Sequence, residues 1–154
     1  MTLDVGDKAP DFELPTDGNG SVKLSDLAGK PVVIYFYPKD MTPGCTTESC
    51  EFRDAEPDFS AVNAQIIGIS KDSALRHDKF KAKHELNFLL ASDEDGTTCE
   101  DFGVWKEKSM YGKKFMGIER STFVIDGDGI IQKAWRKVKV KGHVAEVLEA
   151  VRAL

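Results

Sequence analysis

The chain has 154 residues, of which 41% are hydrophobic and 31% are charged, and its 26 acidic and 21 basic side chains give a formal net charge of −5. This composition is typical of one folded domain and excludes a disordered chain, so we expect a single domain over residues 1–154. The negative charge is opposite in sign to a nucleic-acid-binding surface, and no apolar run approaches the roughly 18 residues that span a bilayer. Neither nucleic acid nor a membrane is therefore an expected partner.

The start of the chain and its cysteine content both indicate a cytoplasmic setting. Residues 1–7 have neither the basic segment nor the apolar segment of a secretory signal, which predicts a cytoplasmic protein. The three cysteines, Cys45, Cys50 and Cys99, form no disulfide framework for a chain of this length. Because a reducing compartment disfavours structural disulfides, we expect catalytic or redox use of cysteine.

The first predicted elements are a short hairpin and a buried strand. Residues 11–14 and 22–24 alternate polar and apolar side chains, and the run between them at 17–20, Asp-Gly-Asn-Gly, favours a turn. Residues 31–38 follow as a β-branched and aromatic run bounded by prolines, which is typical of a central strand.

A parallel crossover is predicted next. Residues 65–70 and 87–91 are apolar runs of strand length, and the charged stretch 72–85 between them is compatible with a helix. Two strands joined by a helix form a βαβ unit, so these strands are expected to be parallel.

The last third of the chain predicts a second hairpin and a closing helix. Residues 121–125 and 130–135 flank the turn sequence Asp-Gly-Asp-Gly, and apolar residues recur at helical spacing over 144–154, after Gly142. Together the elements predict an α/β fold in three layers, in which a central mixed β-sheet is flanked by helices and preceded by an N-terminal β-hairpin.

The segment after the predicted central strand has the residue pattern of a helix start. Thr42 suits the N-cap, Pro43 suits the first helical position, and Cys45 then occupies the third. Unpaired backbone N–H groups and the positive end of the helix dipole favour a thiolate over a thiol at that position. Cys45 is therefore the candidate nucleophile, although a cysteine can also be a small buried hydrophobe.

A metal site is the other interpretation of the cysteines. A structural zinc site needs four ligands, usually in two closely spaced pairs, but the remaining cysteine and the histidines are scattered and form no second pair. We expect no metal and no cofactor, a structural or incidental role for Cys99, and solvated side chains for His77, His84 and His143.

The cysteine segment resembles a known family. Pro38, Thr42 and Cys45 reproduce the Pro-x-x-x-Thr-x-x-Cys signature of peroxiredoxins. With Cys50 and the stretches 90–96, 102–105 and 120–126, the whole chain is similar to the bacterioferritin comigratory protein or peroxiredoxin Q branch. The resemblance implies a thioredoxin-like fold, reduction of hydrogen peroxide and organic hydroperoxides, electrons from thioredoxin or a related dithiol donor, and a monomer.

The resemblance also assigns roles to individual residues. Cys45 would be the peroxidatic thiolate and Cys50 the resolving thiol that forms an intramolecular disulfide with it. Thr42 and Arg120 would orient and polarise the peroxide, since the negative charge that develops on the departing oxygen needs fixed donors. Taken alone, Arg120 could equally be a solvated surface cation.

Three further residues complete the predicted site. Pro38 and the backbone N–H of Gly44 are expected to contact substrate. Glu48 is expected to accept a hydrogen bond from Arg120 and hold it in place, although an acid near a helix start is also favoured by the dipole alone.

Two other functions are compatible with the same fold. A thioredoxin-like disulfide reductase usually carries Cys-x-x-Cys, a spacing that the four residues between Cys45 and Cys50 do not match. A binding module without enzyme activity is the second alternative. Peroxide consumption coupled to a dithiol separates these possibilities.

Overall fold

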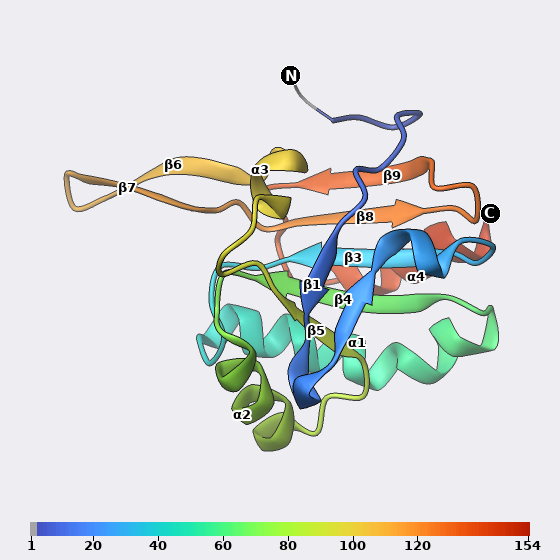
Figure 1. Ribbon diagram of the computed structural model, residues 1–154, viewed down its shortest axis with the longest axis horizontal. Coiled ribbons are helices and arrows are strands. Elements are labelled where there is room, and N and C mark those ends of the chain that lie inside the picture. Colours follow the sequence, from blue (N-terminus) through green and yellow to red (C-terminus); the bar gives the residue numbers. More distant parts are fainter. Residues whose placement is uncertain (1–2) are drawn as a thin grey trace.

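A computed structural model describes residues 3–154 and places a five-stranded sheet at the centre of the protein (Figure 1). Its strands are β3 (Val32–Phe36), β4 (Gln65–Ser70), β5 (Leu89–Ser92), β8 (Ser121–Ile125) and β9 (Ile131–Arg136). In the order β5-β4-β3-β8-β9, the first three strands run parallel, whereas β8 is antiparallel to both β3 and β9. The predicted mixed sheet, parallel crossover and C-terminal hairpin are confirmed.

The central strand is buried on both of its faces. All five residues of β3 are buried, which is why its sequence is a continuous apolar run rather than an alternating one. Val33 and Tyr35 belong to the core on one side of the sheet, and Ile34 and Phe36 belong to the core on the other.

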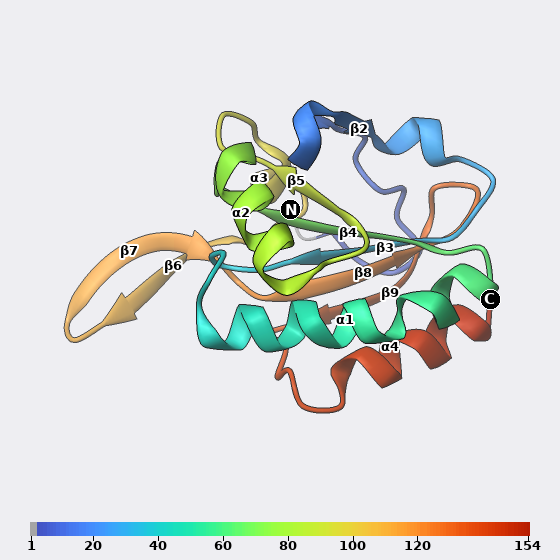
Figure 2. The ribbon, with the colours of Figure 1, turned by 90° about the horizontal axis from the view of Figure 1, so that it is seen from below.

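Three helices lie on one face of the sheet and at one edge. Helices α1 (Pro43–Ala61) and α4 (His143–Arg152) pack together on the same face (Figure 2), while α2 (Ala74–His84) packs against β5. The apolar stripe predicted for the last helix is confirmed at Val144, Val147, Leu148 and Val151, which are buried, whereas Leu154 lies beyond the helix and is exposed. No helix within residues 3–154 combines the length and apolarity needed to cross a membrane.

The opposite face is covered mainly by the N-terminal hairpin. Strands β1 (Glu13–Pro15) and β2 (Ser21–Lys23) are antiparallel, and the short 3-10 helix η1 (Asp17–Asn19) joins them where a turn was predicted. Leu14 and Val22 are paired and buried in the same core as Ile34 and Phe36. The other short helices are the 3-10 helix η2 (Leu24–Leu27) and α3 (Thr98–Asp101).

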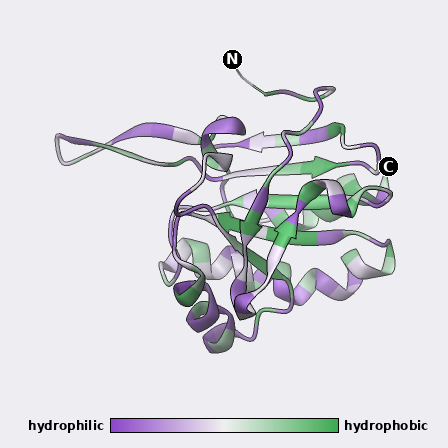
Figure 3. Cartoon of the chain, viewed as in Figure 1, coloured by the Kyte–Doolittle hydropathy of each residue, from purple (hydrophilic) through white to green (hydrophobic). Residues whose placement is uncertain are grey.

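One hairpin was not predicted from the sequence. Strands β6 (Trp105–Met110) and β7 (Lys113–Ile118) pair only with each other and project from the body of the protein (Figure 1). Most of their side chains are exposed, and polar and apolar colours mix along them in Figure 3, whereas the central strands are mostly apolar. Without a buried face, the strands leave no regular hydrophobic period in the sequence.

The turn of this hairpin has a local explanation. Tyr111 and Gly112 form its two-residue loop, with φ values of 52° and 78°. Paired residues with positive φ match the twist of the flanking strands in such a turn, and glycine adopts this conformation without strain. The hairpin leads directly into Arg120 and β8, so its base lies beside the segment that carries the predicted site arginine.

Candidate active site

The start of α1 presents Cys45 as the sequence predicts. Thr42 is the N-cap in an extended conformation, Pro43 is the first helical residue, and the Thr46 N–H donates to the Thr42 carbonyl at 2.9 Å. The Thr42 hydroxyl does not cap the helix. It donates instead to the Lys39 carbonyl at 2.8 Å and so closes the loop that precedes the helix.

Cys45 and Glu48 share one arginine. The guanidinium of Arg120 donates through Nη2 to Cys45 Sγ at 3.3 Å and through Nη1 to Glu48 Oε1 at 2.7 Å. Cys45 and Glu48 are both buried, with exposed fractions of 1% and 0%. The planar guanidinium of Arg120 therefore contacts two residues of α1 that lie more than 70 positions away in the sequence.

Burial sets the electrostatics of this group. Burial raises the pKa of Glu48 to about 7, the charge and hydrogen bond of Arg120 lower it only in part, and the nearby Glu51 raises it further. For Arg120, burial opposes the charged form, but the charges of Glu48 and Cys45 more than offset it and raise its pKa. The arginine therefore stays protonated and places a positive charge beside the Cys45 sulfur.

Gly44 permits the close approach of Arg120. A Cβ atom at position 44 would lie 3.2 Å from Arg120 Nη2, which is tighter than an ordinary contact. The predicted site residue Gly44 therefore has a second reason for its identity, besides its backbone N–H: any side chain there would press on the nitrogen that contacts Cys45.

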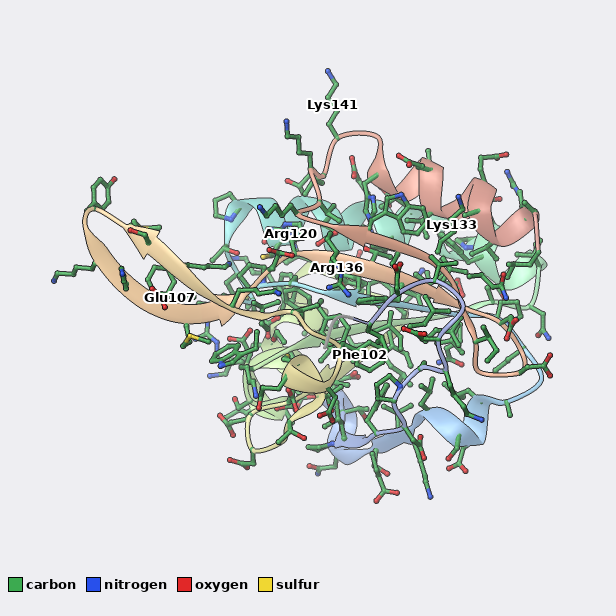
Figure 4. The ribbon with its side chains drawn as sticks, turned by 90° about the horizontal axis from the view of Figure 1, so that it is seen from above. Phe102, Glu107, Arg120, Lys133, Arg136 and Lys141 are labelled. Carbon is green, nitrogen blue, oxygen red and sulfur yellow. The ribbon has the colours of Figure 1, made fainter. Side chains whose placement is uncertain are left out.

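The position of Arg120 depends on the segment between β7 and β8. Its carbonyl accepts a hydrogen bond from the Val138 N–H at 3.0 Å, which fixes the backbone after the hairpin. Figure 4 shows Arg120 near the base of the hairpin, whereas Glu107 lies out along it and Lys141 points away from the body.

A buried polar network holds the loop before α1. The Tyr37 hydroxyl donates to Asp40 Oδ1 at 2.5 Å, and His77 lies with Nδ1 at 2.6 Å from Asp40 Oδ2 and Nε2 at 3.0 Å from the Ala91 carbonyl. All three side chains of this network are essentially inaccessible to solvent. Sequence reasoning missed it, because it depends on α2 meeting the end of β3.

The prediction of solvated histidine side chains is wrong for two of the three. His77 is wholly buried in the network, and His143 is 4% exposed, with Nε2 at 2.8 Å from Thr122 Oγ1. Burial lowers the pKa of His143, and the nearby Arg120 adds to that shift against the opposing charge of Glu146. Only His84 is partly exposed. Their polar sequence neighbours were misleading, because α2 and α4 each bury one face.

The remaining predicted residues differ in burial and in the elements that carry them. Cys50 is half-buried in the same helix as Cys45, and Pro38 is half-buried at the end of the central strand. Cys99 is buried in α3, where burial and the Asp93 carboxylate raise its pKa, so its thiol stays protonated and unreactive. Residues 3–154 contain no group of three or more metal-ligating side chains.

Comparison with known proteins gives one consistent result. A profile of the AhpC/TSA family matches residues 5–134. Peroxiredoxin Bcp of Bacillus subtilis is 57% identical over 152 residues, covering 99% of this chain and 97% of the relative. A PrxQ mutant structure from Xylella fastidiosa has a TM-score of 0.94 at 43% identity, covering 99% of this chain and 98% of that one. The bacterioferritin comigratory protein of Xanthomonas campestris has a TM-score of 0.88 at 48% identity, covering 92% and 90%.

The contact between Arg120 and Cys45 predicts that removing Arg120 lowers the fraction of Cys45 present as thiolate. In a Cys50→Ser background, Arg120→Ala should lower the thiolate absorbance near 240 nm at pH 7, because the buried sulfur loses its adjacent cation. Arg120→Lys should restore only part of the signal, since an ammonium cannot contact both partners as the planar fork does. Arg136→Ala is the control, as Arg136 contacts the Leu3 and Gly103 carbonyls instead. An unchanged absorbance in Arg120→Ala would contradict the assignment.

The raised pKa of Glu48 predicts how stability depends on pH. The folded protein binds the Glu48 proton more tightly than the unfolded chain, whose carboxyl has the ordinary value of 4.5. The stability that this tighter proton binding adds to the folded state is therefore fully present below about pH 4.5 and is lost as pH rises through about 7. Between pH 5 and 8, the unfolding free energy of the wild type should fall relative to that of Glu48→Gln, as measured by urea denaturation. Parallel curves for the two proteins would show that the carboxyl titrates normally.

Proposed function

Because the chain belongs to the AhpC/TSA family, and its relatives are thiol peroxidases of the peroxiredoxin type, we propose that Cys45 reduces hydrogen peroxide and organic hydroperoxides. The observation that carries this proposal is the Arg120 guanidinium at 3.3 Å from Cys45 Sγ, at the N-terminus of a helix. The bacterioferritin comigratory protein of Xanthomonas campestris is described as reducing alkyl peroxides, which supports the organic substrates.

The first step forms a sulfenic acid. The Cys45 thiolate attacks the terminal oxygen of the hydroperoxide, a sulfur–oxygen bond forms, and the oxygen–oxygen bond breaks to release an alkoxide or hydroxide. Charge moves from sulfur to the departing oxygen, so donors fixed around the sulfur favour the transition state. In this proposal the donors are the Arg120 guanidinium, the Gly44 and Cys45 N–H groups and the Thr42 hydroxyl, which turns from the Lys39 carbonyl toward the substrate. Pro38 shields the substrate from solvent.

The second step forms a disulfide within the same helix. Cys50 attacks the sulfenic sulfur of Cys45 and releases water. Five residues of α-helix separate two Cα atoms by about 8.7 Å. A disulfide tolerates at most about 7 Å. The first turns of α1 must therefore unwind before the bond closes.

The cycle ends when thioredoxin or a related dithiol donor reduces the disulfide by thiol exchange. We propose that one domain of residues 1–154, acting as a monomer in the cytoplasm, carries all of these steps. Glu48 accepts a hydrogen bond from Arg120 and holds the guanidinium beside the Cys45 sulfur. The four residues between Cys45 and Cys50 argue against a disulfide reductase, which usually carries Cys-x-x-Cys. The peroxiredoxin relatives argue against a binding module without enzyme activity.

Two cysteine variants test the proposed cycle. Cys45→Ser should consume no peroxide, because no other thiol lies beside Arg120. Cys50→Ser should reduce about one equivalent and then stop as a sulfenic acid that a dimedone probe traps. Cys99→Ser is the matched control and should turn over as the wild type does. Peroxide consumption should be measured with thioredoxin and with a glutathione system in parallel. Continued turnover by Cys45→Ser would refute the proposal.

Unwinding predicts a local change in hydrogen exchange. Gly44, Thr46, Thr47 and Ser49 all form helix poorly, which lowers the cost of opening the first turns while the rest of the fold stays intact. On oxidation, amides within about residues 42–56 should exchange faster, and those of the central sheet should not. Mass spectrometry on the same samples identifies the Cys45–Cys50 disulfide. Equal protection of this segment in both redox states, with that disulfide present, would rule out unwinding.

A further inference from the structure

Lys108 reaches from the projecting hairpin back toward the active site. It lies on β6 opposite Phe115 of β7, and its side chain runs over Gly117, where a Cβ atom would be 3.2 Å from its Cδ and 3.4 Å from its Cε. Gly117 is two residues nearer to the base of the hairpin than Phe115, and the chain continues from there into Arg120. The lysine stem therefore points along the hairpin toward Arg120.

The ammonium group of Lys108 is partly buried among charged groups of the site. Within residues 3–154 it makes no ion pair or hydrogen bond, whereas Lys114 on the opposite face of the hairpin pairs with Glu107 at 3.6 Å. Burial lowers the pKa of Lys108 and the charge of Arg120 lowers it further, while the charges of Cys45 and Glu119 oppose the shift. Burial and a neighbouring cation both disfavour the charged form of a lysine, so Lys108 gives up its proton more readily than a fully solvated lysine does.

We propose that Lys108 donates the proton that the departing oxygen takes up when Cys45 is oxidised. The inference rests on the peroxidase function proposed above. Cys45 thiolate, the hydroperoxide and the Lys108 ammonium give Cys45 sulfenic acid, an alcohol or water, and a neutral Lys108 amine. Sulfur loses two electrons, the broken oxygen–oxygen bond gains them, and the amine regains its proton from solvent.

The other groups around Cys45 are poorer proton donors. A guanidinium does not release its proton in proteins, which excludes Arg120. The Thr42 hydroxyl can donate a hydrogen bond to the departing oxygen, but as an alcohol it is too weak an acid to release its proton. Glu48 accepts from Arg120, and with a pKa of about 7 it is largely ionised at pH 8. An ammonium is a far stronger acid than the alcohol or water that it produces, so the transfer is favourable.

The test compares oxidants whose leaving groups differ in basicity. Reduced wild type, Lys108→Met and Lys108→Arg are mixed with hydrogen peroxide, tert-butyl hydroperoxide or peracetic acid at pH 8, and the first turnover is followed by stopped flow. Methionine keeps the unbranched stem over Gly117, and Lys114→Met is the control on the other hairpin face. Peracetic acid releases acetate, which needs no proton, so its rate reports on the thiolate and the fold alone.

Lys108→Met should react at least about tenfold more slowly with hydrogen peroxide and tert-butyl hydroperoxide, as loss of a general acid predicts, and less than about twofold more slowly with peracetic acid. Lys108→Arg keeps the charge but is a much weaker acid, so it should recover only a small part of the loss. An equal loss with all three oxidants, or a wild-type rate in either variant, would overturn the role of Lys108. Failure of the wild type to react with any peroxide would instead refute the peroxidase proposal.

Discussion

One guanidinium connects the two parts of the chain on which the site depends. Arg120, just before β8, donates to Glu48 and Cys45, which both lie in the first turns of α1. Neither side chain has bulk water to stabilise a negative charge, and the unfavourable burial is visible in the raised pKa of Glu48. The same fork therefore places one positive charge beside two buried acidic groups and ties the loop after the hairpin to the helix. The geometry of the sulfur cannot be separated from that of the carboxylate.

The sequence predicted the parts of the fold whose burial pattern is local. Continuous β-branched runs became the central strands, and the apolar spacing after Gly142 became α4. The β6-β7 hairpin was not predicted, because it pairs only with itself and buries little. The burial of His77 was not predicted either, since its partners, Asp40 and the Ala91 carbonyl, come from other elements. Only the three-dimensional packing of α2 determines that such a polar side chain lies inside.

The candidate site also has a part that local sequence predicts and a part that it does not. Local sequence places Thr42, Pro43 and Cys45 at a helix start, and the structure has this arrangement. That Arg120 meets Cys45 across 75 positions follows from no spacing, and it was expected only because the chain resembles peroxiredoxins. Lys108 had no such signal, because it is one of several lysines in a polar hairpin. What distinguishes it is the absence of a side chain at Gly117, which lets its stem run toward Arg120.

Buried contacts on both sides of the first turns limit which part of α1 can move. On one side, the buried network of Tyr37, Asp40 and His77 holds the loop before Thr42. On the other, Phe52 is fully buried and stacks on Tyr35 at 4.6 Å between ring centres. In the proposed cycle, oxidation to a sulfenic acid replaces a thiolate with a neutral group, so the Arg120 contact loses its charge assistance. In that cycle, the contact that stabilises the first turns of the reduced helix is thereby weakened at the stage when disulfide formation requires those turns to open.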